Sequence, residues 1–176
     1  APTCKEEYLA KLEWSIRQNE HPVAIRVPAT EVISYGEPAE SDYSNLNRYK
    51  VVHRGSKVAI VALGSFFGLG QSVLSLLKNK ANIDATLINP RYITGVDSEL
   101  MDELKAHLEL VITLEDGVLD GGFGEKIARY YGATDMKVLN YGAKKEFVDR
   151  YDVQELLRSN HLTDKQIVED IISLVG

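Results

Sequence analysis

Two arginines lie where a guanidinium group needs an anionic partner. Arg26 falls within the apolar alternation of residues 23–27, and Arg91 follows the apolar segment 85–89. Burying an unpaired charge is costly, so an arginine with apolar neighbours must bind a carboxylate, a set of acceptors or a phosphate. The residues alone leave two interpretations open for each arginine, a structural ion pair and a phosphate clamp, and they favour the ion pair.

The segment 114–126, LEDGVLDGGFGEK, places acids and glycines directly after an apolar stretch. Glu115 and Asp116 could transfer protons or hold a magnesium ion. Acids near a helix N-terminus are, however, commonly loop residues that suit the helix dipole, and we favour that interpretation. Gly121 and Gly122 predict that a helix approaches the sheet or another chain closely, because a Cβ atom would obstruct such an approach.

The other candidate motifs do not support a catalytic or ligand-binding site. The glycines of residues 64–72 fit neither of the common nucleotide-binding patterns, so we expect a structural turn there and not a phosphate loop. The 4 histidines lack the spacing of a metal site or a catalytic triad. We therefore assign no catalytic residue and no metal ligand.

The composition limits the classes of function. With 20 basic and 26 acidic residues the net charge is -6, which argues against a nucleic-acid partner. No apolar run approaches the ~20 residues that cross a bilayer, so no membrane association is expected. Cys4 is the single cysteine and cannot form an internal disulfide, which favours a reducing, cytoplasmic setting.

The chain begins with a predicted helix and a predicted strand. Thr3 and Glu6 have the spacing of a capping box, and apolar residues then recur at helical intervals, which predicts an amphipathic helix over residues 5–19. Alternating apolar residues predict a short strand over 23–27. A lone helix and strand cannot bury a core, so they indicate the tail of a further domain.

The next residues separate this tail from the rest of the chain. Residues 29–48 contain Gly36, Pro38 and several acids without a sustained period, which is typical of a linker. We therefore divide the chain into a domain remnant over 1–28, a linker over 29–48 and a main domain over 49–176.

Apolar segments of strand length recur through the main domain. They predict strands at 49–54, 57–63, 85–89, 109–114 and 137–141. Gly55 and Ser56 lie between the first two and are plausible residues for a hairpin turn.

Predicted helices separate the later strands and close the chain. One follows the glycine-rich loop 64–70, another is capped by Asp97 or Ser98, and two terminal helices begin at Asp152 and Thr163. This order implies right-handed crossovers, an α/β fold and a three-layer sandwich with a mostly parallel sheet. Ligands usually bind at the carboxyl edge of such a sheet. The loops expected at that edge are 64–70, 90–96 and 115–123.

Several of these segments together resemble a known family. PVAIRVP at residues 22–28, and the order of arginine, aspartate, histidine, paired acids and double glycine within 89–124, are similar to the C-terminal portion of the transketolase superfamily of thiamine-diphosphate enzymes. The nearest branch is that of the 1-deoxy-D-xylulose-5-phosphate synthases. The resemblance implies that residues 1–28 are the end of a pyrimidine-binding domain and that a transketolase C-terminal-like domain follows.

The resemblance also implies a function. Such an enzyme transfers two carbons from a 2-oxo donor to an aldehyde phosphate, and Arg26 and Arg91 would bind the acceptor phosphate. Thiamine diphosphate and magnesium would be held upstream of Ala1 and not by this fragment, because Glu115-Asp116-Gly117 lacks the first glycine of the G-D-G cofactor motif. The fragment alone would be inactive. Its partners would be the upstream cofactor-binding and pyrimidine-binding domains and a second copy in a homodimer.

Two alternatives remain open at the level of sequence. The chain could be the C-terminal domain of a 2-oxo acid dehydrogenase beta subunit, which would require a lipoyl partner. It could instead be a stand-alone α/β binding or regulatory module, which would act without the upstream domains.

Overall fold

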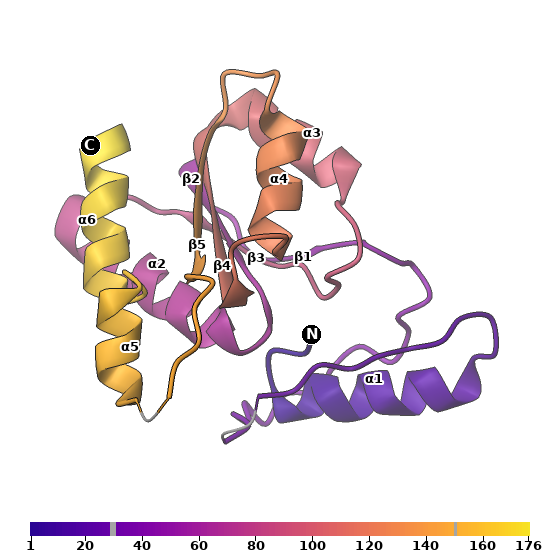
Figure 1. Ribbon diagram of the computed structural model, residues 1–176. Helices are drawn as coiled ribbons and strands as arrows, with labels where there is room; N and C mark the ends of the chain where they lie inside the picture. Colours follow the sequence, from indigo (N-terminus) through magenta and orange to yellow (C-terminus); the bar gives the residue numbers. More distant parts are fainter. Residues whose placement is uncertain (29–30, 150) are drawn as a thin grey trace.

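The computed structural model describes residues 1–28, 31–149 and 151–176. Helices and strands alternate along most of the chain (Figure 1). In chain order, the elements are α1 (Lys5–Arg17), β1 (Lys50–His53), β2 (Lys57–Ala62), the 3-10 helix η1 (Gly64–Phe66), α2 (Phe67–Ala81), β3 (Thr86–Asn89), α3 (Ser98–His107), β4 (Leu108–Val118), α4 (Phe123–Tyr131), β5 (Lys137–Ala143), α5 (Val153–Ser159) and α6 (Asp164–Val175).

The strands of the described residues form a sheet in the order β1-β3-β2-β4-β5. β2 pairs in parallel with β3 and β4, and β4 pairs in parallel with β5, whereas β1 runs antiparallel to β3. In the central register Ile60 lies opposite both Leu87 and Ile112. These side chains are almost fully buried, as expected for nearly continuous apolar strands with both faces covered.

Helices cover both faces of this sheet (Figure 1). On one face α2, α5 and α6 pack against a core that includes Val73, Leu77 and Ile171. On the other face α3 and α4 pack against a core that includes Met101 and Ile127. The structure confirms the α/β prediction of a three-layer sandwich with a mostly parallel sheet.

Local capping signals define where several helices begin. The Asp97 side chain accepts a hydrogen bond from the backbone N–H of Leu100 and caps α3. The Asp152 side chain accepts from the N–H of Glu155 at 2.9 Å and caps α5. Thr163 forms a complete capping box at the start of α6. The predicted starts of these helices are confirmed.

Replacing Thr163 with alanine should lower the free energy of unfolding by about 1 kcal/mol, since the Thr163 side chain accepts from the backbone N–H of Gln166 at the first turn. Urea denaturation followed by circular dichroism would measure the loss. Thr163→Ser keeps the hydroxyl and should retain most of the stability. Equal stability of the alanine and serine variants would contradict a capping contribution.

The predicted hairpin at Gly55 and Ser56 is wrong. β1 pairs with β3 and not with β2, so these residues carry the chain across the end of β3. The N–H of Gly55 donates to Thr86 Oγ1 at 3.0 Å, and the N–H of Ser56 donates to the carbonyl oxygen of Asp84 at 2.6 Å. A Cβ atom on Gly55 would lie 2.0 Å from that carbonyl oxygen, so the crossing needs glycine.

The N-terminal predictions are confirmed only in part. The predicted helix over 5–19 ends at Arg17, and its first turn is tied by Thr3 to Glu7 and not to Glu6. The predicted strand over 23–27 is wrong, because these described residues pair with no strand. Of the predicted linker 29–48, residues 29 and 30 lie outside the described residues, and 31–48 contain no helix or strand.

Two predicted loops are partly regular structure. The glycine-rich segment 64–70 forms η1 and the first turn of α2 instead of an open loop. A Cβ atom on Gly70 would lie 2.8 Å from the Cβ of Ala62, so glycine lets α2 pack closely on β2. β4 continues to Val118, four residues beyond the predicted end, through a register shift against β5.

Candidate functional site

Arg91 lies at the carboxyl end of β3, two residues after Asn89, in a left-handed conformation with φ 60°. This conformation is uncommon for residues other than glycine and needs support from neighbouring groups. The N–H of Arg91 donates to Asn89 Oδ1 at 2.9 Å. Its carbonyl oxygen accepts from Lys11 Nζ at 2.8 Å and from the Ala1 amino group at 3.0 Å. Helix α1 therefore helps to hold the backbone that presents this arginine.

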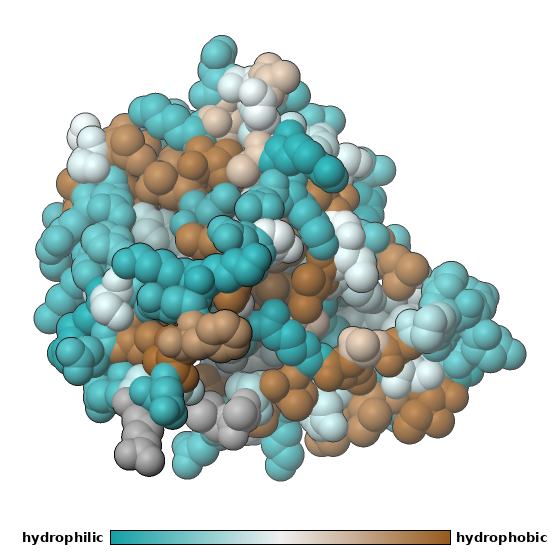
Figure 2. All heavy atoms as spheres, viewed as in Figure 1, coloured by the Kyte–Doolittle hydropathy of each residue, from teal (hydrophilic) through white to brown (hydrophobic). Residues whose placement is uncertain are grey.

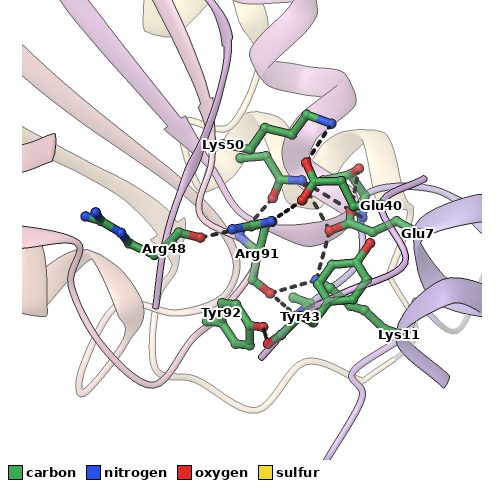
Figure 3. A network of polar contacts seen from close by, with 11 residues as sticks. Glu7, Lys11, Glu40, Tyr43, Arg48, Lys50, Arg91 and Tyr92 are labelled. Carbon is green, nitrogen blue, oxygen red and sulfur yellow. Dashed lines mark hydrogen bonds and ion pairs between the residues drawn. The ribbon is translucent and has the colours of Figure 1, made fainter. Parts of the chain in front are cut away.

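The side chain of Arg91 is 11% exposed and has acceptors on two sides (Figure 3). Its Nε donates to the carbonyl oxygen of Arg48 at 2.9 Å, and Nη1 lies 2.5 Å from Glu40 Oε2. The guanidinium carbon lies 5.9 Å from the centre of the Tyr43 ring. The structure thus shows an ion pair at this position, one of the two interpretations that the sequence left open.

A buried ion pair joins α1 to the same edge of the sheet. Lys11 Nζ lies 2.9 Å from Glu7 Oε1, and each side chain is 7% exposed. Asn89 Nδ2 donates to Glu7 Oε2 at 3.2 Å, and the Lys11 ammonium lies over the rings of Tyr43 and Tyr92 at 5.2 and 5.6 Å. These cation–π contacts and the carboxylate compensate the charge that burial removes from water.

Burial and mutual attraction act in opposite directions on the titration of this pair. Burial alone would raise the pKa of Glu7, but the Lys11 ammonium and the hydrogen bonds from Thr3 outweigh it, so the pKa lies below its usual value. Burial lowers the pKa of Lys11, and the Glu7 carboxylate offsets only part of that effect. Glu7 and Lys11 therefore form an ion pair in which each group stabilises the charged form of the other.

A cavity of about 280 Å³ opens beside Arg91. Glu40 and Lys50 lie in its wall, and the Glu40 carboxylate reaches both cations, with Lys50 Nζ 3.2 Å from Oε1 (Figure 3). The lining combines charged, polar and apolar side chains. It consists of Thr3, Cys4, Glu7, Tyr35, Glu37, Pro38, Ala39, Glu40, Tyr43, Lys50, Val52, Phe67, Gln71, Asn89 and Arg91.

Arg26 occupies a different position at the carboxyl edge. Its guanidinium forms an ion pair with Asp116 of β4 and donates to the Asp116 carbonyl oxygen at 2.9 Å. The Asp116 carboxylate also accepts from the Ser65 hydroxyl. Arg26 does not line the cavity beside Arg91. The structure therefore brings both predicted arginines to one edge of the sheet but pairs each with its own carboxylate.

Glu115 has a structural role that its sequence position indicated. Its side chain is almost fully buried and accepts from the N–H groups of Phe123 at 2.8 Å and Gly124 at 2.9 Å, the first residues of α4. A Cβ atom on Gly122 would lie 2.6 Å from Glu115 Oε1, and Gly121 has φ 73°. The predicted close approach is confirmed for Gly122, and the preference for an acid at a helix N-terminus explains Glu115.

These acids do not fit a metal or diphosphate site. Both oxygens of Glu115 cap α4, and Asp116 is paired with Arg26 and Ser65. The described residues contain no cluster of three or more histidine, cysteine, aspartate or glutamate residues suited to a metal ion. None of the helices in the described ranges has the length and apolar character needed to cross a membrane.

The sequence pattern did not single out the residues around Arg91. Glu7 and Lys11 form an (i, i+4) pair, a spacing that usually marks a solvent-exposed helix face. Glu40 lies in a segment without periodicity, and Lys50 lies on an edge strand, so neither position carried a functional signal. A partner for Arg91 was required by the argument from charge, but its identity was not available from spacing.

Comparisons with known proteins find relatives of this chain. Residues 47–167 match the family described as "Transketolase, C-terminal domain". The 1-deoxy-D-xylulose-5-phosphate synthase of Clostridium tetani (strain Massachusetts / E88) is 32% identical over 177 residues, which cover 99% of this chain and 28% of that protein. The corresponding synthase of Dehalococcoides mccartyi (strain CBDB1) is 31% identical over 180 residues, which cover 97% and 27%. The chain thus spans little more than a quarter of the length of these relatives.

Solved structures share the fold. A split-gene transketolase in the form of an inactive beta4 tetramer superposes with a TM-score of 0.66 at 25% identity, over 84% of this chain and 45% of that chain. A mutant transketolase from Pichia stipitis superposes with a TM-score of 0.52 at 13% identity, over 73% and 18%. The second likeness concerns the fold alone.

Proposed function

This chain belongs to the family of transketolase C-terminal domains, and from that premise we propose that it is the C-terminal part of a thiamine-diphosphate-dependent enzyme of the 1-deoxy-D-xylulose-5-phosphate synthase or transketolase type. The intact enzyme transfers a two-carbon unit from a 2-oxo donor to an aldehyde phosphate. Similarity to the Clostridium tetani synthase along 99% of the chain supports this assignment over the dehydrogenase-subunit and stand-alone alternatives.

In this proposal the chain binds the acceptor phosphate and takes no direct part in forming or breaking covalent bonds. The observation that carries this role is the placement of Arg91, whose nearly buried guanidinium lines a cavity at the carboxyl edge of the sheet. We propose Arg26 as a second cation that contacts the phosphate in the whole enzyme; it lies at the same edge of the sheet, outside this cavity and paired with Asp116. A guanidinium matches two phosphate oxygens with parallel N–H donors, so it can fix the orientation of the aldehyde.

The remaining parts of the enzyme complete the active site. We assign residues 1–28 to the end of a pyrimidine-binding domain, 29–48 to a linker and 49–176 to the C-terminal domain. Thiamine diphosphate and magnesium are supplied by cofactor-binding and pyrimidine-binding domains on other residues, because Glu115 and Asp116 are engaged in helix capping and an ion pair. The chain by itself therefore does not transfer two-carbon units.

Association with those domains and with a second copy is supported by the surface of α1. Leu9, Leu12 and Ile16 are 50%, 37% and 75% exposed and share one helix face by their spacing. Figure 2 shows hydrophobic atoms gathered over the part of the surface where α1 lies. An apolar face of this kind is typical of an interface. The tetramer of the split-gene transketolase is a precedent for assembly of such a chain as a separate subunit.

Replacing Arg91 with alanine in the whole enzyme should raise KM for an aldehyde phosphate about 10- to 100-fold, because a hydrogen bond to a charged group contributes roughly 1.5–3 kcal/mol. Steady-state kinetics with the phosphorylated acceptor and its unphosphorylated analogue would measure the effect. KM for the analogue should change little, and Arg91→Lys should recover part of the loss.

Arg54 offers a matched control, since it is also paired with a glutamate, Glu103, but lies away from the cavity and is 61% exposed. Arg54→Ala should leave both KM values unchanged. An unchanged KM for the phosphorylated acceptor in the Arg91→Ala enzyme would exclude the proposed role of Arg91.

A further inference from the structure

Glu40 joins two cations that approach the cavity from different elements. Its Oε2 lies 2.5 Å from Nη1 of Arg91 at the end of β3, and its Oε1 lies 3.2 Å from Nζ of Lys50 at the start of β1 (Figure 3). One anion thus neutralises two positive charges, each through a separate oxygen. A phosphate group carries more negative charge than a carboxylate and can present oxygens to both cations in the same way.

The rest of the cavity suits a small phosphorylated molecule better than a bare ion. Phe67 and Val52 provide apolar surface, and Gln71 and Asn89 provide amide groups. The carboxylate of Glu7 also lines the cavity, but Lys11 at 2.9 Å balances its charge. Lys50 and Arg91 are therefore the cations that an incoming anion would meet.

The Glu40 carboxylate is bound weakly enough for a ligand anion to displace it. It belongs to residues 31–48, which contain no helix or strand, and its side chain is 44% exposed. The pair with Lys50, which is 49% exposed, contributes little, since water and salt screen it and the side chains lose rotamer freedom. Arg91, in contrast, is held firmly, because hydrogen bonds to Asn89 and Arg48 fix its backbone and its Nε. A ligand anion can therefore exchange with the carboxylate while the arginine keeps its position.

We propose that Lys50 and Arg91 form one phosphate-binding site, that Glu40 occupies this site when no ligand is bound, and that a phosphorylated ligand binds by displacing the Glu40 carboxylate. This inference rests on the proposed function, from which it takes the ligand, an aldehyde phosphate. It adds two residues to the proposed phosphate site. Lys50 is a specificity-determining residue for the phosphate, and Glu40 is an internal competitor that lowers affinity for it.

The test is a calorimetric titration of the full 176-residue chain with inorganic phosphate. Glu40→Gln removes the competing charge and should lower Kd about three- to fivefold. Lys50→Gln removes one cation and should raise Kd by a similar factor, since an exposed charge pair contributes up to about 1 kcal/mol and 1.4 kcal/mol corresponds to tenfold. Both side chains are about half exposed, so the variants should keep the fold, which circular dichroism would verify.

Glu37→Gln is the matched control. Glu37 lines the same cavity, and no ion pair within the described residues joins it to Lys50 or Arg91. Its replacement removes the same charge from the same wall and should change Kd less than twofold, as expected for a screened charge. Equal effects of the Glu37 and Glu40 variants, or no phosphate binding by wild type and Glu40→Gln alike, would overturn the proposal.

Kinetics of the whole enzyme separate this inference from the proposed function. Glu40→Gln should lower KM for the aldehyde phosphate, and Lys50→Gln should raise it. If the Arg91→Ala enzyme shows a raised KM while Glu40→Gln leaves phosphate affinity unchanged, the inference fails and the proposed function stands. If Glu40→Gln tightens phosphate binding while Arg91→Ala leaves KM unchanged, the anion site stands and its proposed use fails.

Discussion

Replacing Glu7 with glutamine should lower the free energy of unfolding by about 3–5 kcal/mol, because breaking a buried ion pair leaves the partner charge uncompensated. The Lys11 ammonium would remain 7% exposed, close to the rings of Tyr43 and Tyr92 and to the Arg91 carbonyl oxygen but without a carboxylate partner. Urea denaturation would give the loss of stability. Trp14, the single tryptophan, lies on α1 with its ring 6.2 Å from that of Tyr43, so its fluorescence reports the detachment of this helix.

Two variants test whether the loss comes from the unpaired charge. Lys11→Met combined with Glu7→Gln removes both charges and should recover most of the stability. Glu13→Gln breaks a pair with Arg17 on the same helix that is exposed, and should cost less than about 0.5 kcal/mol. Similar losses for Glu7→Gln and Glu13→Gln would show that burial does not strengthen the pair.

The same pair gives stability a defined dependence on pH. The pKa of Glu7 lies below its usual 4.5 in the folded chain, so its contribution is complete above that value and is lost as the pH falls through the lowered pKa. The difference in stability between wild type and Glu7→Gln should therefore shrink when unfolding is measured below pH 4.5. A constant difference across this range would contradict a charged Glu7.

The second large effect is expected at Glu115. Glu115→Gln should lower the free energy of unfolding by about 3 kcal/mol, since the amide nitrogen cannot accept from the N–H groups of Phe123 and Gly124 and one of them stays buried without an acceptor. Differential scanning calorimetry would record the lower Tm. Glu109→Gln, at an exposed position of β4, is the control and should have little effect. Equal Tm values for the two variants would contradict the capping role.

The features that the sequence predicted correctly depend on neighbours along the chain. Asp97, Asp152 and Thr163 bond to N–H groups three residues later, so spacing alone determines the contact. The buried strands were equally clear, because β2 and β4 need apolar side chains on both faces.

The wrong predictions concern contacts between distant residues. β1 and β2 are separated by three residues, but β3 lies between them in the sheet, and only packing with the whole sheet decides that order. Residues 23–27 have strand-like alternation, yet a strand needs a partner, and they pair with no strand among the residues that the structure describes. In the proposed division of the chain, that partner belongs to the pyrimidine-binding domain.

The arginines of the candidate site were predictable from the sequence, and the residues around them were not. Arg91 stood out because a charge next to an apolar strand must be compensated. Its partners come from α1 and from residues 31–48, so no spacing connects them. Glu7 and Lys11 even had the pattern of a solvated pair, and only the fold buries them.

The left-handed backbone conformation of Arg91 couples the docking of helix α1 to the binding of any ligand that contacts this arginine. The Lys11 bond to the Arg91 carbonyl oxygen stabilises this conformation, and a ligand that requires the conformation must stabilise the bond in return. Ligand binding should therefore slow proteolysis within α1, whose buried residues Glu7 and Lys11 become accessible when the helix detaches. Conversely, a protein that binds the detached form of α1 would weaken ligand affinity without touching the cavity.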